Sequence, residues 1–152
     1  MSRHPEAPDD SCRFCLAEAD SAACSELGMF QNADWALDLD DRGIPGWFLL
    51  RSRRHVEGFE SLSETESGSF GPTLTLTLGA IRSSYPCGPI YLVSFGETFP
   101  HFHMLLSARP RELDPARSKA QFLIDPAAFV DHQLAKQISL EVQRLLAAEP
   151  ET

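Results

Sequence analysis

The chain has 152 residues, the size of one ordinary domain built around one hydrophobic core. Hydrophobic residues make up 43% of it and charged residues 23%, as in typical globular proteins, and no apolar run approaches the roughly 20 residues that a membrane-spanning helix needs. The net charge of −9 would repel a phosphate backbone, so we expect neither a nucleic-acid polymer nor a membrane as a partner.

The amino-terminal residues predict no export. The segment MSRHPEAPDDSC has no apolar stretch behind a basic one, so we expect a cytoplasmic location, where the four cysteines would stay reduced. Residues 1–11 are polar and contain prolines, which predicts a loose arm. CRFC follows, and then LAEADSAACSELG, which is compatible with a short helix or an irregular loop. We find no internal repeat or linker, so residues 1–152 are expected to form a single domain.

The next segments predict two antiparallel strands. Residues 29–40, MFQNADWALDLD, end in an alternation that places Trp35, Leu37 and Leu39 on one face of a strand. DDRGIPG then has the composition of a hairpin connection. WFLLRSRRH, apolar at its start, predicts the second strand of the hairpin.

The second half predicts two helices and two more strands. Ser63 and Glu66 have the spacing of a capping box, so we expect a helix from about Ser63 to Ser83; TLTLTL inside it also alternates like a strand, but Pro72 disfavours a central strand. PIYLVSF and HFHMLLSA predict strands. Asp125 and Pro126 predict the start of a long amphipathic helix. Its apolar stripe would comprise Val130, Leu134, Ile138, Val142 and Leu145.

These elements together predict an α+β fold. It would be an antiparallel sheet with one central helix and a C-terminal helix, both on one face of the sheet.

Two histidines lie one residue apart in GETFPHFHMLLSARP. In an extended strand His101, His103 and Leu105 share one face, while Phe102, Met104 and Leu106 lie on the other and are predicted core residues. The two imidazoles would then be about 7 Å apart, which suits a shared ligand or substrate. Such pairs also occur in strands without any functional role, so both alternatives stay open.

The ordered set of motifs is more specific than the pair. PGWFLLRSRRHVEGFESL, followed later by GETFPHFHMLLSAR, resembles two halves of the histidine-triad family of nucleotide hydrolases and transferases. The hallmark of that family is His-φ-His-φ-His-φ-φ, where φ is apolar, after a Gly-Gln-Ser/Thr loop. A Pro-Gly turn and a strand that ends near a histidine come earlier in its chain. The resemblance covers about Cys12 to Arg109 and implies a compact α+β fold, usually a homodimer.

The resemblance also implies an activity. His103 would be the nucleophile that attacks a nucleotide α-phosphate and forms a nucleotidyl-histidine, and His101 would be the first triad member. The implied substrates are nucleotides such as dinucleoside polyphosphates or nucleoside phosphoramidates. A neutral imidazole with one nitrogen held as a donor has its other nitrogen free to attack phosphorus.

The same resemblance indicates residues that would bind the nucleotide. Thr98 matches a Ser/Thr whose hydroxyl and backbone donate toward the phosphate, in a loop with Gly96 and Glu97. Trp35 with Leu37 or Leu39 would contact a base, unless they are ordinary core residues. Asp40 or Asp41 would accept hydrogen bonds from the ribose hydroxyls.

The sequence departs from the family pattern at two positions. Leu105 occupies the third triad position and offers no hydrogen bond, and Glu97 lies where the family commonly has glutamine. A carboxylate near a phosphate is repelled by about 4 kcal/mol for unit charges 4 Å apart at an effective dielectric constant of 20. These departures favour an alternative function, a catalytically weakened nucleotide-binding or regulatory module with a structural zinc.

Cys12-x-x-Cys15 has the spacing of a zinc knuckle but is only half a tetrahedral site. Some histidine-triad proteins complete such a knuckle with a histidine after the second strand and with the first triad histidine. The resemblance therefore implies a structural zinc held by Cys12, Cys15, His55 and His101. The alternatives are a redox pair or two free buried thiols, and Cys24 is a reserve ligand if His55 is not one.

Overall fold

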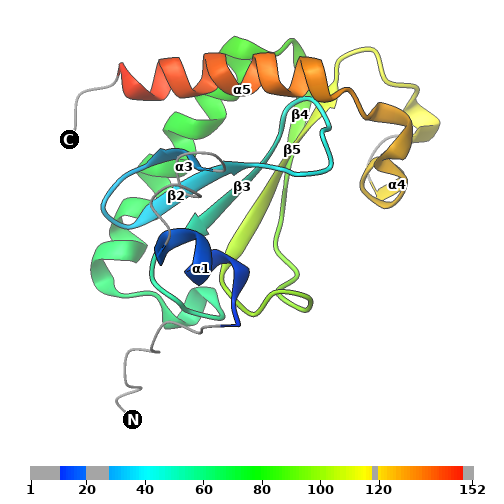
Figure 1. Ribbon diagram of the computed structural model, residues 1–152. Helices are drawn as coiled ribbons and strands as arrows, with labels where there is room; N and C mark the ends of the chain where they lie inside the picture. The colour runs from blue at the N-terminus through cyan, green and yellow to red at the C-terminus, as the bar shows by residue number, and fades with distance from the viewer. Residues whose placement is uncertain (1–10, 20–27, 118–119, 149–152) are drawn as a thin grey trace.

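The structure is a computed structural model of the chain, and it describes residues 11–19, 28–117 and 120–148 (Figure 1). One five-stranded sheet has the strand order β1-β2-β3-β5-β4, and each neighbouring pair is antiparallel. The strands are β1 (Gly28–Gln31), β2 (Trp35–Leu39), β3 (Trp47–Ser52), β4 (Cys87–Val93) and β5 (His103–Pro110). The helices are α1 (Arg13–Ala19), α3 (Glu64–Ser84), α4 (Ala120–Ile124) and α5 (His132–Ala147). The predicted α+β fold is confirmed.

The strand register divides the side chains between two faces of the sheet. Arg51 of β3 pairs with His103 of β5, and Leu49 pairs with Leu105. Because side chains alternate along a strand, these residues share one face, which we call the histidine face. The intervening residues form the main core on the opposite face, among them Trp35, Leu37, Phe48, Leu50 and Leu106.

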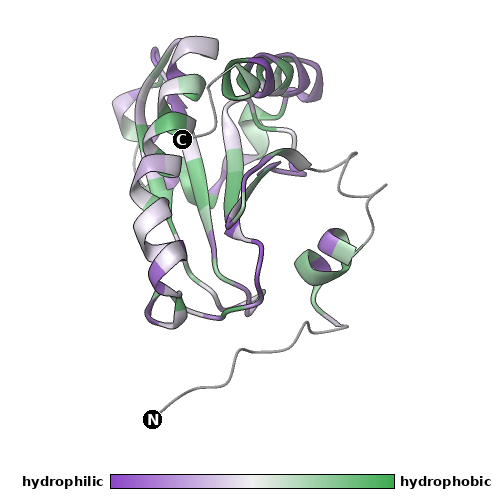
Figure 2. Cartoon of the chain, turned by 90° about the vertical axis from the view of Figure 1, so that its left-hand side faces the viewer, coloured by the Kyte–Doolittle hydropathy of each residue, from purple (hydrophilic) through white to green (hydrophobic). Residues whose placement is uncertain are grey.

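Helices cover both faces of the sheet. The main core lies beneath α3 and α5, which pack against each other, and α5 also contacts β1. On the histidine face, α1 buries Phe14 and α4 buries Phe122. Figure 2 shows α3 and α1 on opposite sides of the sheet. The two predicted helices, α3 and α5, therefore lie on one face as expected, whereas α1 and α4 each bury an aromatic residue on the opposite face, which was not predicted from the sequence.

The predicted helix over residues 63–83 is confirmed as α3. Its N-cap is Ser63, whose hydroxyl accepts a hydrogen bond from the backbone N–H of Glu66, while the Glu66 carboxylate accepts one from the backbone N–H of Ser63. The alternation of TLTLTL does not make a strand. Thr73 and Thr77, one helical turn apart, are both buried against the sheet.

The C-terminal helix begins later than the sequence predicts. Pro126–Phe129 form a short 3-10 turn after Asp125, whose side chain caps nothing in it. Val130 is extended, and the N-cap of α5 is Asp131, whose carboxylate accepts from the backbone N–H of Leu134. The backbone N–H of Asp131 donates to the carbonyl of Gly43, a contact with the β2–β3 turn that no local pattern encodes.

Residues 29–40 form two strands rather than one continuous element. The Asn32 side-chain oxygen accepts hydrogen bonds from the backbone N–H groups of Asp34 and Trp35, which closes a tight turn between β1 and β2. In the β2–β3 turn, Gly46 has φ of 78°, and a Cβ there would lie 2.8 Å from the Cβ of Ala108. Glycine is therefore required at this position for β3 to pair with β5.

A membrane-spanning helix needs both sufficient length and a predominantly apolar character. None of the described helices is both long enough and apolar enough to span a bilayer.

Glu66→Gln tests the capping box and its charge. Burial disfavours ionisation of Glu66, but hydrogen bonds from Arg54 and Ser63 outweigh it and lower the pKa of this carboxyl. Ionised Glu66 therefore stabilises the fold above its unfolded pKa of about 4.3, and this contribution disappears as the pH falls through the folded pKa. We expect the variant to lose about 1–2 kcal/mol of unfolding free energy at pH 7 and to approach the wild type in acid. Urea unfolding at several pH values measures this, and a deficit that does not depend on pH would contradict it.

Candidate functional site

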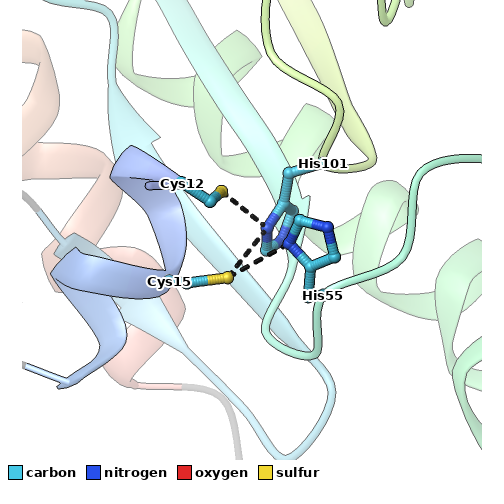
Figure 3. Close-up of side chains that lie close together, drawn as sticks. All are labelled: Cys12, Cys15, His55 and His101. Carbon is cyan, nitrogen blue, oxygen red and sulfur yellow. Dashed lines mark hydrogen bonds between the residues drawn. The ribbon is translucent and has the colours of Figure 1, made fainter. Parts of the chain in front are cut away.

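Two cysteines at the start of the first helix and two histidines from separate loops meet on the histidine face. Cys12 precedes α1 and Cys15 lies in its first turn, His55 follows β3, and His101 precedes β5. One ligand atom from each of these residues lies within 4.8 Å of the others. Figure 3 shows both sulfur atoms directed at the imidazole rings of His55 and His101. The structure thus brings together the four residues that the resemblance implies as metal ligands.

The interatomic distances fit a tetrahedral zinc site. His101 Nδ1 lies 3.4 Å from Cys12 Sγ and 3.7 Å from Cys15 Sγ, and His55 Nδ1 lies 3.2 Å from Cys15 Sγ. With Zn–S bonds of about 2.3 Å and Zn–N bonds of about 2.0 Å, tetrahedral geometry puts a sulfur and a nitrogen ligand roughly 3.5 Å apart, and the three distances lie within about 0.3 Å of that value. Two thiols and two imidazoles are also the donor set that zinc prefers. These residues therefore fit the metal.

The tautomer of His101 is determined by a second hydrogen bond. Its Nε2 lies 2.7 Å from the backbone carbonyl of Ser52, which can only accept, so Nε2 carries the proton and Nδ1 presents its lone pair to the two sulfurs. Burial lowers the pKa of His101 to about 4, so the ring is neutral at physiological pH. A histidine that binds a metal commonly donates its other ring N–H to a backbone carbonyl in this way.

His103 is oriented by the backbone of His101. Its Nδ1 lies 2.7 Å from the His101 carbonyl oxygen, so Nδ1 is the donor and Nε2 keeps the free lone pair. Ser94 fixes the same residue from the other side, because its hydroxyl donates to the His103 carbonyl. His103 is partly exposed, whereas His101 is fully buried. Of the two rings, only that of His103 has both an available nitrogen and access to solvent.

Aromatic side chains surround the two histidines. The Phe14 ring of α1 lies 5.3 Å from the His101 ring and 5.4 Å from the His103 ring, measured between centroids. Phe99, from the loop before β5, lies 6.4 Å from His103. The guanidinium of Arg13 lies over both phenyl rings. The helix that carries the Cys15 thiol therefore also covers one side of the His103 ring.

A buried ion-pair network lies beside His103. Arg51, which pairs with His103 in the register, is 1% exposed; its Nε donates to Asp38 Oδ2 at 2.6 Å and its Nη1 to Glu18 Oε1 at 2.8 Å. Glu18 Oε2 also accepts from Arg53 Nε at 3.2 Å. Burial raises the pKa of Asp38, although Arg51 acts in the opposite direction. The Phe14 ring packs on the Arg51 guanidinium, so α1 covers this ion-pair network on the side that faces away from the sheet.

The predicted phosphate loop lies between β4 and β5. Glu97 and Thr98 are exposed, and Gly96 has φ of 70°, a conformation that favours glycine. The Glu97 carboxylate is therefore in solvent, where its repulsion of a phosphate is screened. The binding roles of these three residues remain predictions.

Other predicted nucleotide contacts do not fit the structure. Leu37 is fully buried in the main core on the opposite face, so its predicted contact with a nucleotide is wrong; the same holds for Trp35. The Asp40 carboxylate is buried and held by the guanidinium of Arg42 at 2.7 and 2.8 Å, so it is not open toward the histidines. Asp41 is exposed and pairs with Arg13 of α1 at 3.6 Å. On β2, the acidic residue nearest the histidine pair in the register is instead Asp38.

Leu105, at the third triad position, belongs to a second hydrophobic cluster. It packs with the buried residues Ile44, Trp47 and Phe122, beneath α4. The C-terminal segment therefore covers the part of the histidine face where a third histidine would lie. A leucine is compatible with that apolar environment, and an imidazole would need a hydrogen-bond partner there.

Sequence comparisons find no relatives. No protein-family model matches the chain, and no curated protein matches it.

Solved structures, in contrast, match over most of the chain. A HIT-like protein involved in cell-cycle regulation from Bartonella henselae has a TM-score of 0.66 at 11% identity, over 91% of this chain and 99% of its own. A hypothetical histidine triad nucleotide-binding protein from Sulfolobus tokodaii also has a TM-score of 0.66, at 16% identity over 90% of this chain and 92% of its own. The chain has the histidine-triad fold.

A zinc-bound example of the histidine-triad fold is also similar to this chain. This Mycobacterium smegmatis protein has a TM-score of 0.56 at 15% identity, over 91% of this chain and 98% of its own. The histidine-triad fold predicted from the motifs is therefore confirmed, although identities this low show the fold alone.

Three residues of the site, Phe14, Glu18 and Asp38, were assigned no role in the sequence analysis. At the end of the second strand, Arg51 is compatible by sequence with either a local positive field for a nucleotide or a simply solvated side chain. The only signal in the sequence is that Asp38 and Arg51 are charged residues inside predicted strands, where an unpaired charge is costly. Which residues pair with them depends on how α1 packs on the sheet, and no local pattern encodes that packing.

Leu105→His tests whether the third triad position can be restored by one substitution. We expect the variant to lose about 1–2 kcal/mol of unfolding free energy and to gain no turnover, because the imidazole would lie against Trp47 and Phe122. Urea unfolding and a nucleotide hydrolysis assay measure the two effects. Leu105→Met, which keeps the apolar volume, is the control and should stay near the wild type. Unchanged stability with a large rise in turnover would show that the position is still open to a ligand.

Proposed function

We propose that the chain is a nucleotide hydrolase or nucleotidyl transferase that acts at an α-phosphate through His103. The observation that carries the proposal is the hydrogen bond from His103 Nδ1–H to the His101 carbonyl, which leaves Nε2 as a free nucleophile. The similar Sulfolobus tokodaii protein is described as nucleotide-binding, which supports a nucleotide as the ligand.

The proposed reaction has two steps. Nε2 of His103 attacks the α-phosphorus, a P–N bond forms, and the bond to the leaving group breaks: a P–O bond in a dinucleoside polyphosphate, whose phosphate leaves as an anion, or a P–N bond in a phosphoramidate, whose amine takes a proton from solvent. The ring, still protonated at Nδ1, becomes cationic, and the His101 carbonyl stabilises that charge. Water or another hydroxyl acceptor then attacks phosphorus and releases its proton to solvent, the P–N bond breaks, and His103 returns to its neutral form. The loop of Gly96, Glu97 and Thr98 would supply donors to the phosphate oxygens.

A structural zinc would be held by Cys12, Cys15, His55 and His101. A closed site with four protein ligands leaves no position for substrate, so the metal would fasten the N-terminal helix to the sheet. In that role His101 would be a positioning residue, because its carbonyl orients His103 while its ring binds the metal.

One observation favours a second function, that of a nucleotide-binding or regulatory module with weak or no catalysis. Leu105 is part of the hydrophobic cluster beneath α4. An apolar side chain without a hydrogen-bond donor therefore replaces the third triad histidine, which would assist the leaving group. Removal of one stabilising donor commonly lowers the rate by about 10²–10³.

The homodimer that the resemblance implies is part of the proposal. β4 is an edge strand of the sheet, and near it Leu92 and Phe95 are 45% and 78% exposed. Apolar residues along an unpaired edge are features that a partner chain can cover.

Metal analysis tests the proposed zinc site. The purified chain should contain about one zinc ion, and Cys15→Ser should lose it, because a hydroxyl is a poor ligand for this metal. With free zinc 1,000-fold above its dissociation constant, the variant should lose about 4 kcal/mol of unfolding free energy. Cys87→Ala, at a buried cysteine outside the cluster, should keep the metal. A wild-type chain that stays free of metal with reduced thiols in excess zinc would rule the site out.

A labelling experiment tests the nucleophile. After incubation with an adenosine phosphoramidate, intact-mass spectrometry should show an acid-labile adenylyl adduct on the wild type. The control variant His132→Ala, which removes an exposed histidine of α5, should show the same adduct. His103→Ala should show no adduct and at least a 10³-fold lower turnover, as expected for loss of a covalent nucleophile. Nucleotide binding without any adduct on the wild type would favour the second function instead.

A further inference from the structure

Two arginines of the histidine face hold one carboxylate between them. Glu18 Oε1 lies 2.8 Å from Arg51 Nη1, and its Oε2 lies 3.2 Å from Arg53 Nε. Arg51 lies in β3 on the same face as His103, and Arg53 follows the last residue of the strand; both guanidinium groups reach the Glu18 carboxylate of α1. A carboxylate bridged by two guanidinium groups has the geometry in which arginines also bind phosphate.

The contact between the two arginines and Glu18 is accessible to solvent on the side of Arg53. Arg51 is almost fully buried, but the Arg53 side chain is 35% exposed and that of Glu18 is 16% exposed. An anion could therefore replace the Glu18 carboxylate without entering the core. Such an anion would lie beside the Phe14 ring, which contacts both the Arg51 guanidinium and the His103 ring.

Glu18 is placed where it can leave the arginines. It lies in the last turn of α1, where a negative charge is unfavourable for the helix dipole. Cys12, Phe14 and Cys15, which fasten the helix to the sheet, all precede it. The end of a seven-residue helix can open at low cost, because so short a helix has little stability of its own. Glu18 could thus swing outward while the metal ligands and Phe14 stay in place.

The charges in this cluster balance only while the Glu18 carboxylate, or an anion in its place, contacts the arginines. Arg51 and Arg53 carry two positive charges, and Asp38 and Glu18 carry two negative charges. Without the Glu18 carboxylate one positive charge is uncompensated in a largely buried position, and this attracts an anion strongly.

We propose that Arg51 and Arg53 form a phosphate subsite beside His103, which Glu18 occupies as an internal competitor. The ligands are polyphosphate anions, so a substrate with phosphates beyond the α-phosphate binds more tightly than a nucleoside monophosphate. This inference deepens the proposed function by naming a substrate class, but its test is binding and does not depend on turnover.

Pyrophosphate binding measured by isothermal titration calorimetry tests the subsite on the full chain. Removal of the competing charge in Glu18→Gln should tighten pyrophosphate binding by about tenfold, as expected when a charge-assisted contact no longer has to be displaced. The gain should persist in Glu18→Gln with His103→Ala, because the subsite is separate from the nucleophile. It should disappear in Glu18→Gln with Arg53→Gln, whose altered side chain is partly exposed.

A matched control separates the subsite from a general effect of charge. Glu141→Gln also removes a carboxylate from an arginine, Arg144, at 2.7 Å on the exposed face of α5, and should leave pyrophosphate affinity unchanged. If Glu18→Gln lowers the melting temperature and leaves pyrophosphate affinity unchanged or weaker, Glu18 is only a structural clamp and the proposal fails. A chain that binds pyrophosphate in this way but never forms an adduct on His103 would refute the proposed reaction and leave the subsite standing.

Discussion

The site depends on three bonds made by one residue, His101. Its Nε2–H donates to the Ser52 carbonyl at the end of β3, its Nδ1 faces the thiols of Cys12 and Cys15, and its backbone carbonyl accepts from His103. The two ring contacts are linked: the donor bond selects the tautomer, and that tautomer presents a lone pair to the thiols. The backbone carbonyl of the same residue selects the tautomer of His103.

The N-terminal helix carries more of the site than its length suggests. Within seven residues α1 supplies one of the thiols, the Phe14 ring that covers both histidines, and the Glu18 carboxylate that neutralises Arg51. So short a helix is marginal in isolation, and it is stable here because the sheet buries Phe14 and the four cysteine and histidine side chains of the cluster converge beside it. The position of the helix and the accessibility of His103 are therefore coupled.

The fold was predictable where a local pattern has a single structural solution. The capping box of Ser63 and Glu66 predicted the start of α3 correctly, because both hydrogen bonds form within four consecutive residues. The start of α5 was not predictable in the same way. Asp125 and Asp131 are both acceptable caps by sequence, and the choice between them rests on the hydrogen bond from Asp131 to the distant Gly43. The predicted contact of Leu37 with a nucleotide base does not fit the structure for a related reason. Alternation predicts which residues share a face of the sheet, but it does not predict which face carries the site.

The sequence by itself determined the ligand types and the alternation that puts His101, His103 and Leu105 on one face, because spacing along an extended chain is a covalent property. The tertiary structure alone decided that Arg51 meets Asp38 and Glu18, that Phe14 covers His103, and that Leu105 is enclosed beneath α4. Those contacts join elements far apart in the chain, and they depend on how two helices pack on the sheet. The sequence motif therefore identifies the two histidines. The packing of α1 and α4 on the sheet determines which of the two rings is accessible and which charged side chains lie beside that ring.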